Sequence, residues 1–471
     1  MTEIHDMTGL EQADAVRRRE VSPVELARYY LDRIDRLNSS VGAFVTVTPE
    51  RALRRAAELE RNGPGNAASP LWGVPTAIKD LNLTAGVPTQ FGNAAFKDFD
   101  LGVDDYVVEH IQAAGLVSLG KTNVPEVGLP CYTEPEIAPP ARTPHDLERS
   151  AGGSSGGAAA ATASGLVPLA QGNDGAGSVR IPASVCGLVG VKTTRGRVSN
   201  GPVFSDINGL AVNGPLARTV ADAAALLDVM AGSHDGDPYT LPPLPVGETF
   251  LAAAAKRPAK LAIGRYATPV VPGATVEPEC MEAYERATAL LADLGHTVED
   301  CDPPFGEDLV PQFEVIWSSA AASLPIPPEA EEGLRPLTRW LRERGRTYSA
   351  ADFATALSAA QIASRQAIMA SAKYDAVLTP TLAQTPRPVG WFRNDDDPAA
   401  EFELQKRFTP FTAPYNITGQ PAVTLPLHWT PTGLPVGVHL VGRMGDEATL
   451  LALGAEIEEA APWRDHKPSI W

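Results

Sequence analysis

Hydrophobic positions in the first third of the chain alternate between helical and strand-like spacing. Ser22 can cap a helix that Pro23 opens, and Leu26, Tyr30 and Ile34 then recur on one face of it. Short apolar runs predict strands at residues 43–47, 74–78 and 117–119, and helical spacing predicts helices that end near residue 62 and span residues 104–114. Helices that follow strands in this way are typical of an α/β fold.

The same alternation resumes in the second half of the chain. Its predicted helices are residues 219–232, 277–294 and 447–460, and its predicted strands are residues 260–263, 296–299, 422–427 and 436–441. Residues 307–373 are mostly helical in pattern, and we interpret them as a helical insertion that caps the substrate. No repeat or linker divides the chain, so we expect one domain over residues 1–471. The alternation predicts a largely parallel sheet with helices on both faces.

Composition narrows the classes of function. The 471 residues carry a net charge of −18 and no dense cluster of Lys and Arg, so nucleic acid is not an expected partner. No apolar run reaches the length of about 18 residues that indicates a membrane span. The four cysteines lie far apart and match no metal-binding spacing, and the polar N-terminus lacks a signal-peptide pattern. We therefore expect a cytoplasmic monomer or homodimer without metal or cofactor.

Two segments rich in Gly and Ser, residues 152–157 and 172–180, are the strongest sign of chemistry. One alternative is a flexible linker, and a second is a phosphate-binding loop, although neither segment ends in the Gly-Lys-Ser/Thr that such a loop needs. The functional interpretation is a serine nucleophile, Ser178, beside backbone N–H groups that stabilise an oxyanion. The predicted donors of this oxyanion hole are Gly175, Ala176, Gly177 and Ser178.

A serine nucleophile needs a base. None of the eight histidines lies in a motif that resembles the partner of such a serine. Lys79 ends an apolar run, where its ammonium would be poorly solvated, and to act as a base its pKa would have to fall by roughly three units. The alternative is a surface lysine that pairs with the adjacent Asp80.

Five motifs, spread over most of the chain in a fixed order, make the sequence resemble the amidase signature family. They are residues 73–80, 117–123, 152–157, 172–184 and 412–421, and 24 residues separate Ser154 from Ser178. The resemblance implies that Lys79 is the base and Ser178 the nucleophile. It also implies that Ser154, held by a cis peptide bond, passes the proton from Ser178 to Lys79.

The resemblance implies further roles and a fold. Ser155 would steady the network of hydroxyl groups, and Asp174 and Arg180 would support the loop rather than react. The expected fold is a single large α/β domain in which a twisted, mixed β-sheet of about eleven strands lies between helices.

Two departures from the usual family pattern bear on function. Ala176 stands beside the oxyanion donors where many members have glycine, and this variant resembles the branch that contains 6-aminohexanoate cyclic dimer hydrolases and urethane-cleaving amidases. Ile181 stands where glutamyl-tRNA amidotransferase A subunits have Gln, which favours an enzyme that acts alone.

The regions that vary in this family suggest a largely apolar substrate pocket. Its predicted wall consists of Leu129, Cys131, Tyr132, Ile137, Phe313, Ile316 and Trp317. The alternative is that these residues belong to the ordinary core. We expect small aryl or alkyl amides as substrates, with esters and carbamates (urethanes) also cleaved. Two other functions stay open: an amidotransferase subunit that releases ammonia from glutamine for a tRNA-bound acceptor, and a non-catalytic binding protein.

Overall fold

The computed structural model describes residues 3–64, 69–204 and 206–471. Its eleven described strands form one sheet of three strands and one of eight. The strands are β1 (Phe44–Val47), β2 (Pro75–Lys79), β3 (Val117–Thr122), β4 (Leu169–Asp174), β5 (Val189–Lys192), β6 (Val212–Ala217), β7 (Ala262–Arg265), β8 (Thr297–Asp300), β9 (Ala376–Pro380), β10 (Ala422–Trp429) and β11 (Pro435–Gly442).

The eight-stranded sheet is mixed. Its order is β4-β6-β5-β10-β11-β9-β7-β8, and only the β9–β7 and β7–β8 pairs in it are parallel. The mixed sheet implied by the resemblance is therefore confirmed, although the strands divide between two sheets. The largely parallel sheet predicted from alternation is wrong. Hydrophobic spacing does not encode strand direction, and β10 and β11 are joined by a short hairpin that makes them antiparallel.

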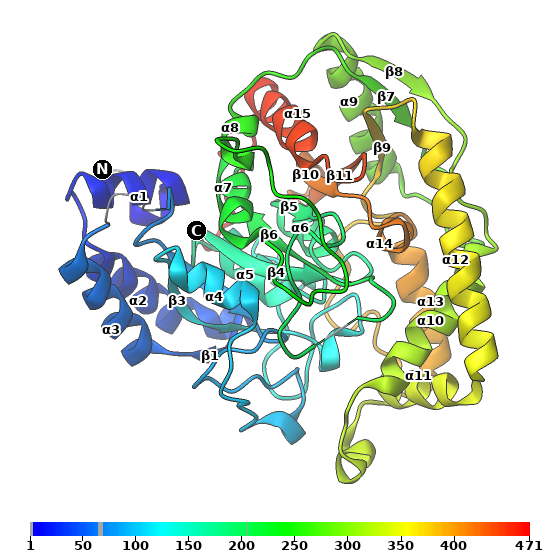
Figure 1. The fold of residues 1–471 in the computed structure, drawn as a ribbon, viewed down its shortest axis with the longest axis horizontal. Coiled ribbons are helices and arrows are strands. Elements are labelled where there is room, and N and C mark those ends of the chain that lie inside the picture. Colours follow the sequence, from blue (N-terminus) through cyan, green and yellow to red (C-terminus); the bar gives the residue numbers. More distant parts are fainter. Residues whose placement is uncertain (1–2, 65–68, 205) are drawn as a thin grey trace.

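The helices surround these sheets (Figure 1). They are α1 (Gly9–Arg17), α2 (Pro23–Val41), α3 (Pro49–Asn62), α4 (Tyr106–Ala113), α5 (Gly156–Ala163), α6 (Arg180–Cys186), α7 (Val220–Met230), α8 (Phe250–Ala254), α9 (Pro278–Asp293), α10 (Leu309–Ser323), α11 (Pro336–Thr347), α12 (Ala350–Ser371), α13 (Pro398–Phe408), α14 (Pro414–Thr418) and α15 (Glu447–Ala460). Figure 1 shows α1–α3 at one end of the molecule and α10–α13 at the other.

Helices cover both faces of the central strands of the large sheet, whereas the edge strand β8 is mostly exposed. On β10, Val423 and Leu425 pack with residues of α7, α9 and α15, whereas the alternate Ala422 packs with residues of α10 and α12. The short helices α5 and α6 cover β4 and β6 on the face of Ala170 and Leu216. Because successive side chains of a strand point to opposite faces of the sheet, the same strands can pack against helices on both faces.

Several predicted elements are confirmed closely. Ser22 caps α2 by accepting from the Glu25 backbone N–H, and Glu25 accepts in return from the Ser22 N–H. Helices α10, α11 and α12 occupy most of residues 307–373, so the helical pattern of that segment is confirmed.

Within the described residues, no helix is long and apolar enough to cross a membrane. The two ends of the chain meet, since the Trp471 indole N–H donates to Asp6.

Candidate active site

Lys79 lies at the end of β2 with its side chain fully buried. Its Nζ lies 2.8 Å from Ser154 Oγ, 2.5 Å from Asn173 Oδ1 and 3.2 Å from the Asn173 carbonyl oxygen. The Lys79 backbone N–H donates to Gln171 Oε1 (2.9 Å), so the side chain of a neighbouring β4 residue fixes the end of the strand. The structure thus brings Lys79 and Ser154 into direct contact.

The lysine lacks the counter-charge that the alternative interpretation required. Asp80, also buried, pairs with Lys121 at 3.2 Å instead of with Lys79. Burial lowers the pKa of Lys79 well below its usual value, and the nearby Asp174 carboxylate only partly opposes this shift. The interpretation of Lys79 as a surface lysine paired with Asp80 is therefore wrong.

Ser154 lies beside Lys79, and the adjacent Ser155 lies between β4 and the Ser178 loop. The peptide bond between Gly153 and Ser154 is cis. Ser155 donates from Oγ to the Asn173 carbonyl oxygen (3.1 Å), and its backbone N–H donates to the Ser178 carbonyl oxygen (3.2 Å). The Ser178 hydroxyl has no hydrogen bond to another residue in the described part of the chain, and it faces a cavity. Ser154 therefore adjoins Lys79 at the end of β2, and Ser155 adjoins β4 and the Ser178 loop. No direct bond joins Ser154 Oγ to Ser178 Oγ.

Asp174 and Arg180 form a buried ion pair that holds the loop between them. Arg180 donates to both carboxylate oxygens of Asp174 at 2.9 Å. The same carboxylate accepts from the backbone N–H groups of Gly177 (2.7 Å) and Val179 (3.1 Å). Burial raises the pKa of Asp174, but Arg180 outweighs it and the pKa stays below its usual range. The geometry agrees with the supporting position implied for both residues.

One of the four predicted oxyanion donors is already used. The Gly177 N–H donates to Asp174, so it cannot also point at a substrate oxygen. Within the described residues, the N–H groups of Gly175, Ala176 and Ser178 have no acceptor. In the structure the Gly177 N–H is therefore engaged by Asp174, and the N–H groups of the other three residues are free of an acceptor among the described residues. The oxyanion hole itself stays a prediction. The sequence could not reveal this difference, because nothing in the pattern of residues 175–178 distinguishes one backbone N–H group from another.

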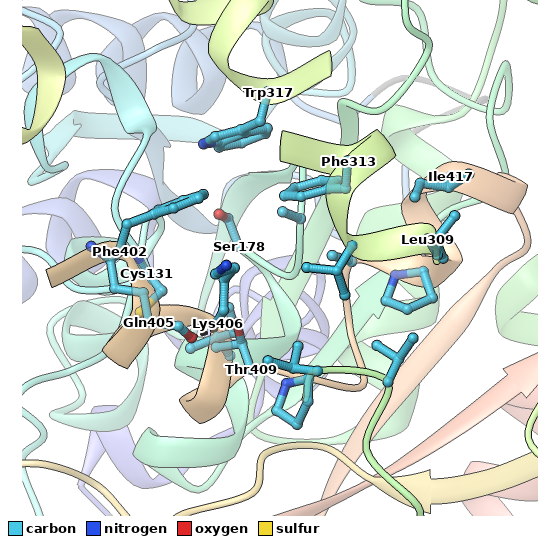
Figure 2. A pocket seen from close by; sticks show the side chains of 18 of the residues that line it. Cys131, Ser178, Leu309, Phe313, Trp317, Phe402, Gln405, Lys406, Thr409 and Ile417 are labelled. Carbon is cyan, nitrogen blue, oxygen red and sulfur yellow. Dashed lines mark hydrogen bonds between the residues drawn. The ribbon is translucent and has the colours of Figure 1, made fainter. Parts of the chain in front are cut away.

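Ser178 lines a narrow cavity of about 80 Å³, shown in Figure 2. This active-site cavity holds four of the seven predicted wall residues, Leu129, Cys131, Phe313 and Trp317. The rings of Phe313 and Trp317 stack with their centroids 5.4 Å apart. Most of the remaining wall is apolar as well, with Ala176, Ile181, Val270, Val271, Leu309, Val310, Phe402, Ala413 and Ile417 among its residues.

The other three predicted wall residues lie elsewhere. Ile316 is 1% exposed and packs in the core beneath α10, which is the alternative given for it from the sequence. Tyr132 is fully buried, with its hydroxyl bonded to Glu401 and Arg335. Ile137 is half-buried in a loop outside the cavity. Successive residues of a helix or loop point in different directions, so neighbours of true wall residues were included wrongly.

Sequence reasoning missed a whole wall of the cavity. Helix α13 contributes Phe402, Gln405 and Lys406, and Thr409 follows at its end (Figure 2). Their spacing of three, one and three residues places them on one face of a helix. That spacing is visible in the sequence, but nothing in it showed that this face meets Ser178. Asn173, which contacts Lys79, was also missed.

Comparison with known proteins shows which families and structures this chain resembles. A model of the Amidase family matches residues 25–451. A putative amidase of Synechocystis sp. is 38% identical, covering 98% of this chain and 89% of the relative. An acylamidase of Rhodococcus erythropolis is 34% identical, covering 100% and 99%. A solved structure of 6-aminohexanoate cyclic dimer hydrolase complexed with substrate superposes with a TM-score of 0.91 at 32% identity, covering 99% of this chain and 100% of that one.

Proposed function

Since this chain belongs to the Amidase family and is an amidohydrolase that acts on C–N bonds, we propose that it cleaves small, partly hydrophobic amides through an acyl-enzyme. Ser178 is the nucleophile, Ser154 the proton relay and Lys79 the base. The observation that carries this proposal is the buried Lys79 amine, which lies 2.8 Å from Ser154 Oγ and has no paired carboxylate among the described residues.

The proton path follows from the charge of Lys79. A neutral amine accepts the Ser154 proton, and Ser154 in turn accepts the proton of Ser178 as Ser178 Oγ attacks the substrate carbonyl carbon. When the C–N bond breaks, Ser154 returns a proton to the leaving amine. Water then attacks the acyl-Ser178 ester and gives a proton through Ser154 to Lys79. Return of a proton by the same path to Ser178 Oγ releases the acid and restores the serine.

The loop before Ser178 supports the negative charge of the tetrahedral intermediate. The N–H groups of Gly175, Ala176 and Ser178 are the candidate donors, and each such donor typically contributes about 3–4 kcal/mol to transition-state stabilisation. The buried ion pair between Asp174 and Arg180 fixes this loop, so the N–H donors of the loop need little reorganisation during the reaction.

The cavity supports a neutral, partly hydrophobic substrate. Its largely apolar wall favours an aryl or alkyl group beside the scissile bond. The ammonium of Lys406 is already bound by Glu314 and Glu403, so it offers no unpaired charge to an anionic substrate. Esters and carbamates present a similar carbonyl with an easier leaving group, and we propose that they are cleaved too. Because α10 supplies Leu309, Phe313 and Trp317, we also propose that residues 307–373 cap the substrate.

The amidotransferase alternative has less support. Ile181 lines the cavity with an apolar side chain near Ser178, where a glutamine substrate would need polar partners for its carboxamide. The solved glutamyl-tRNA(Gln) amidotransferase subunit from Thermotoga maritima, 29% identical to this chain, shares the fold with a TM-score of 0.80, but it does not favour that activity over hydrolysis.

The proposal is tested by covalent labelling and by turnover. A fluorophosphonate probe should form an adduct with the wild-type enzyme and none with Ser178→Ala, and mass spectrometry of the labelled peptide should locate the adduct on Ser178. A p-nitroanilide, a p-nitrophenyl ester and an aryl carbamate, assayed in parallel, should all be hydrolysed. Labelling that survives Ser178→Ala, or turnover of none of the three substrates, would overturn the proposal.

A further inference from the structure

Gln405 is a polar residue in the otherwise largely apolar wall of the active-site cavity. It lies on α13, is 5% exposed, and lines the cavity together with Ser178. Figure 2 shows it beside Cys131 and Phe402, on the α13 side of the cavity, away from Phe313 and Leu309 of α10. A buried carboxamide at this place calls for hydrogen-bond partners on both of its ends.

One end of the carboxamide is fixed by the backbone. The Cys131 N–H donates to Gln405 Oε1 at 3.0 Å. The reversed orientation would set the amide NH₂ against this N–H, donor against donor, so the contact defines which end is which. The Nε2 amide group is therefore directed away from Cys131. It has no acceptor in the part of the chain that the structure describes.

Neither of the two neighbouring polar side chains on this wall accepts a hydrogen bond from Gln405 Nε2. The Lys406 ammonium is itself a donor and is bound by Glu314 and Glu403. The Thr409 hydroxyl donates to the backbone carbonyl of Gln405, not to its side chain. A buried donor without an acceptor costs free energy, and an acceptor that enters the cavity recovers it. Side-chain rotations of the size needed to admit such a group are common on binding.

We propose that Gln405 is a specificity-determining residue, whose Nε2 donates a hydrogen bond to a second acceptor oxygen of the substrate. The preferred substrate is then a neutral amide that carries a carbonyl or ether oxygen in addition to its scissile carbonyl. This inference rests on the proposed function of the same cavity, and it narrows the substrate class from any apolar amide to one with an acceptor at a defined distance from the reacting bond.

A series of matched substrates tests this. The reference is hexanoyl p-nitroanilide, and the oxo analogues replace one chain methylene at a time by a carbonyl group. We expect one analogue to exceed the reference in kcat/KM by about tenfold, the gain expected when a buried donor finds its acceptor. Gln405→Met should abolish this preference while it still hydrolyses the reference. Arg407→Gln, an exposed position on the same helix, should keep the wild-type preference.

Gln405→Glu is a more specific test. It preserves an oxygen that accepts from the Cys131 N–H and replaces only the Nε2 amide donor. It should disfavour the oxo analogue and favour a chain that carries an amine in its place. Thermal unfolding of each variant checks that it is folded. If the reference is cleaved but no oxo analogue is preferred, or if the preference survives in Gln405→Met and Gln405→Glu, the inference about Gln405 is wrong and the proposed hydrolase remains. If the wild type cleaves neither reference nor analogues, the proposed function itself fails.

Discussion

At the scale of single residues, the proposed mechanism depends on Lys79, which is buried and has no paired carboxylate in the part of the chain that the structure describes. Burial in low dielectric disfavours the ammonium of Lys79, and this lowers its pKa well below the usual value despite the opposing Asp174. Hydrogen bonds to Asn173 keep the amine in place beside Ser154. A base of this kind is available at a pH where a solvated lysine would be protonated.

The activity should therefore have an acidic limb set by Lys79. The deprotonated amine is the active form, so kcat/KM should fall as the pH drops through the lowered pKa of Lys79 and level off above it. The measurement is kcat/KM for a p-nitroanilide between about pH 5 and pH 10. Lys79→Met should reduce the rate by about 10²–10⁴-fold, the usual contribution of a general base. A variant that retains the wild-type rate would show that another group is the base.

His439 is a second residue-scale feature that the sequence did not indicate. Its Nε2 lies 3.1 Å from Arg180 Nη1, which can only donate, so this nitrogen is the acceptor. Its Nδ1 then donates to Thr379 Oγ1 (3.0 Å), which donates to the Pro380 carbonyl oxygen. Burial and Arg180 both lower the pKa of His439. The neutral imidazole thus fixes the guanidinium that holds Asp174.

Replacing this imidazole should loosen the Ser178 loop. His439→Leu removes the acceptor of one Arg180 Nη1–H and the ring N–H donor to Thr379, whose own bond to the Pro380 carbonyl oxygen remains. We expect the free energy of unfolding to fall by about 1–3 kcal/mol for the buried Arg180 donor left unpaired. The value is measured by urea unfolding. Because the loop donors would shift, kcat should fall more than KM rises. Equal stability of wild type and variant would contradict the role of His439 in this network.

At the scale of elements, the loop that joins β4 to α6 has two glycines with different requirements. Gly177 has φ +127°, and a Cβ there would lie 2.4 Å from Thr412 Oγ1. A Cβ on Gly175 would lie 3.6 Å from the Trp317 ring, an ordinary contact. The positive φ of Gly177 and the close approach of Thr412 therefore require glycine at position 177 but not at position 175.

These two positions form a matched pair for mutation. Gly177→Ala should lower the free energy of unfolding by about 1–3 kcal/mol, because the methyl group meets Thr412 in a backbone conformation that favours glycine. Gly175→Ala should leave it nearly unchanged. Chemical unfolding of the two variants and of the wild type gives the comparison. Equal losses in both would show that the loop does not hold the geometry described.

At the scale of the whole molecule, the sequence predicted the residues of the candidate site better than the cavity wall and the sheet around them. The order of the motifs identified Lys79, Ser154 and Ser178, and the structure brings their segments together from β2, the turn before α5 and the turn before α6. The assignment of their roles stays a prediction, as do the single domain, the oligomeric state and the cytoplasmic location. The wall on α13 was missed because its contact with Ser178 joins segments more than 200 residues apart, and only the fold sets such a distance. Strand direction was missed because spacing of side chains is the same in both directions.

The helical segment and the rest of the chain are joined by a buried polar network centred on Arg335. Its guanidinium donates to the Tyr132 hydroxyl and to Asp395, both at 2.8 Å, and its backbone N–H donates to Glu126 at 3.0 Å. Tyr132 adjoins Cys131 of the cavity wall, and Arg335 immediately precedes α11. The Arg335 side chain, of which only 3% is exposed, therefore links the start of α11 to Tyr132 and to Asp395.

Arg335→Met should consequently affect the whole molecule. The buried Glu401 carboxylate lies 3.7 Å from the Arg335 guanidinium. Removing the guanidinium leaves this carboxylate uncompensated, and the free energy of unfolding should fall by about 3–5 kcal/mol. Because Trp317 and Phe313 belong to the helices that would loosen, KM for aryl amides should rise while kcat changes less. Arg339→Met on the same helix, whose weak bond to the Glu332 carbonyl is exposed, is the control. Urea unfolding and limited proteolysis between α10 and α11 measure the effect, and similar values for the two variants would show that Arg335 does not join the helices to the body of the protein.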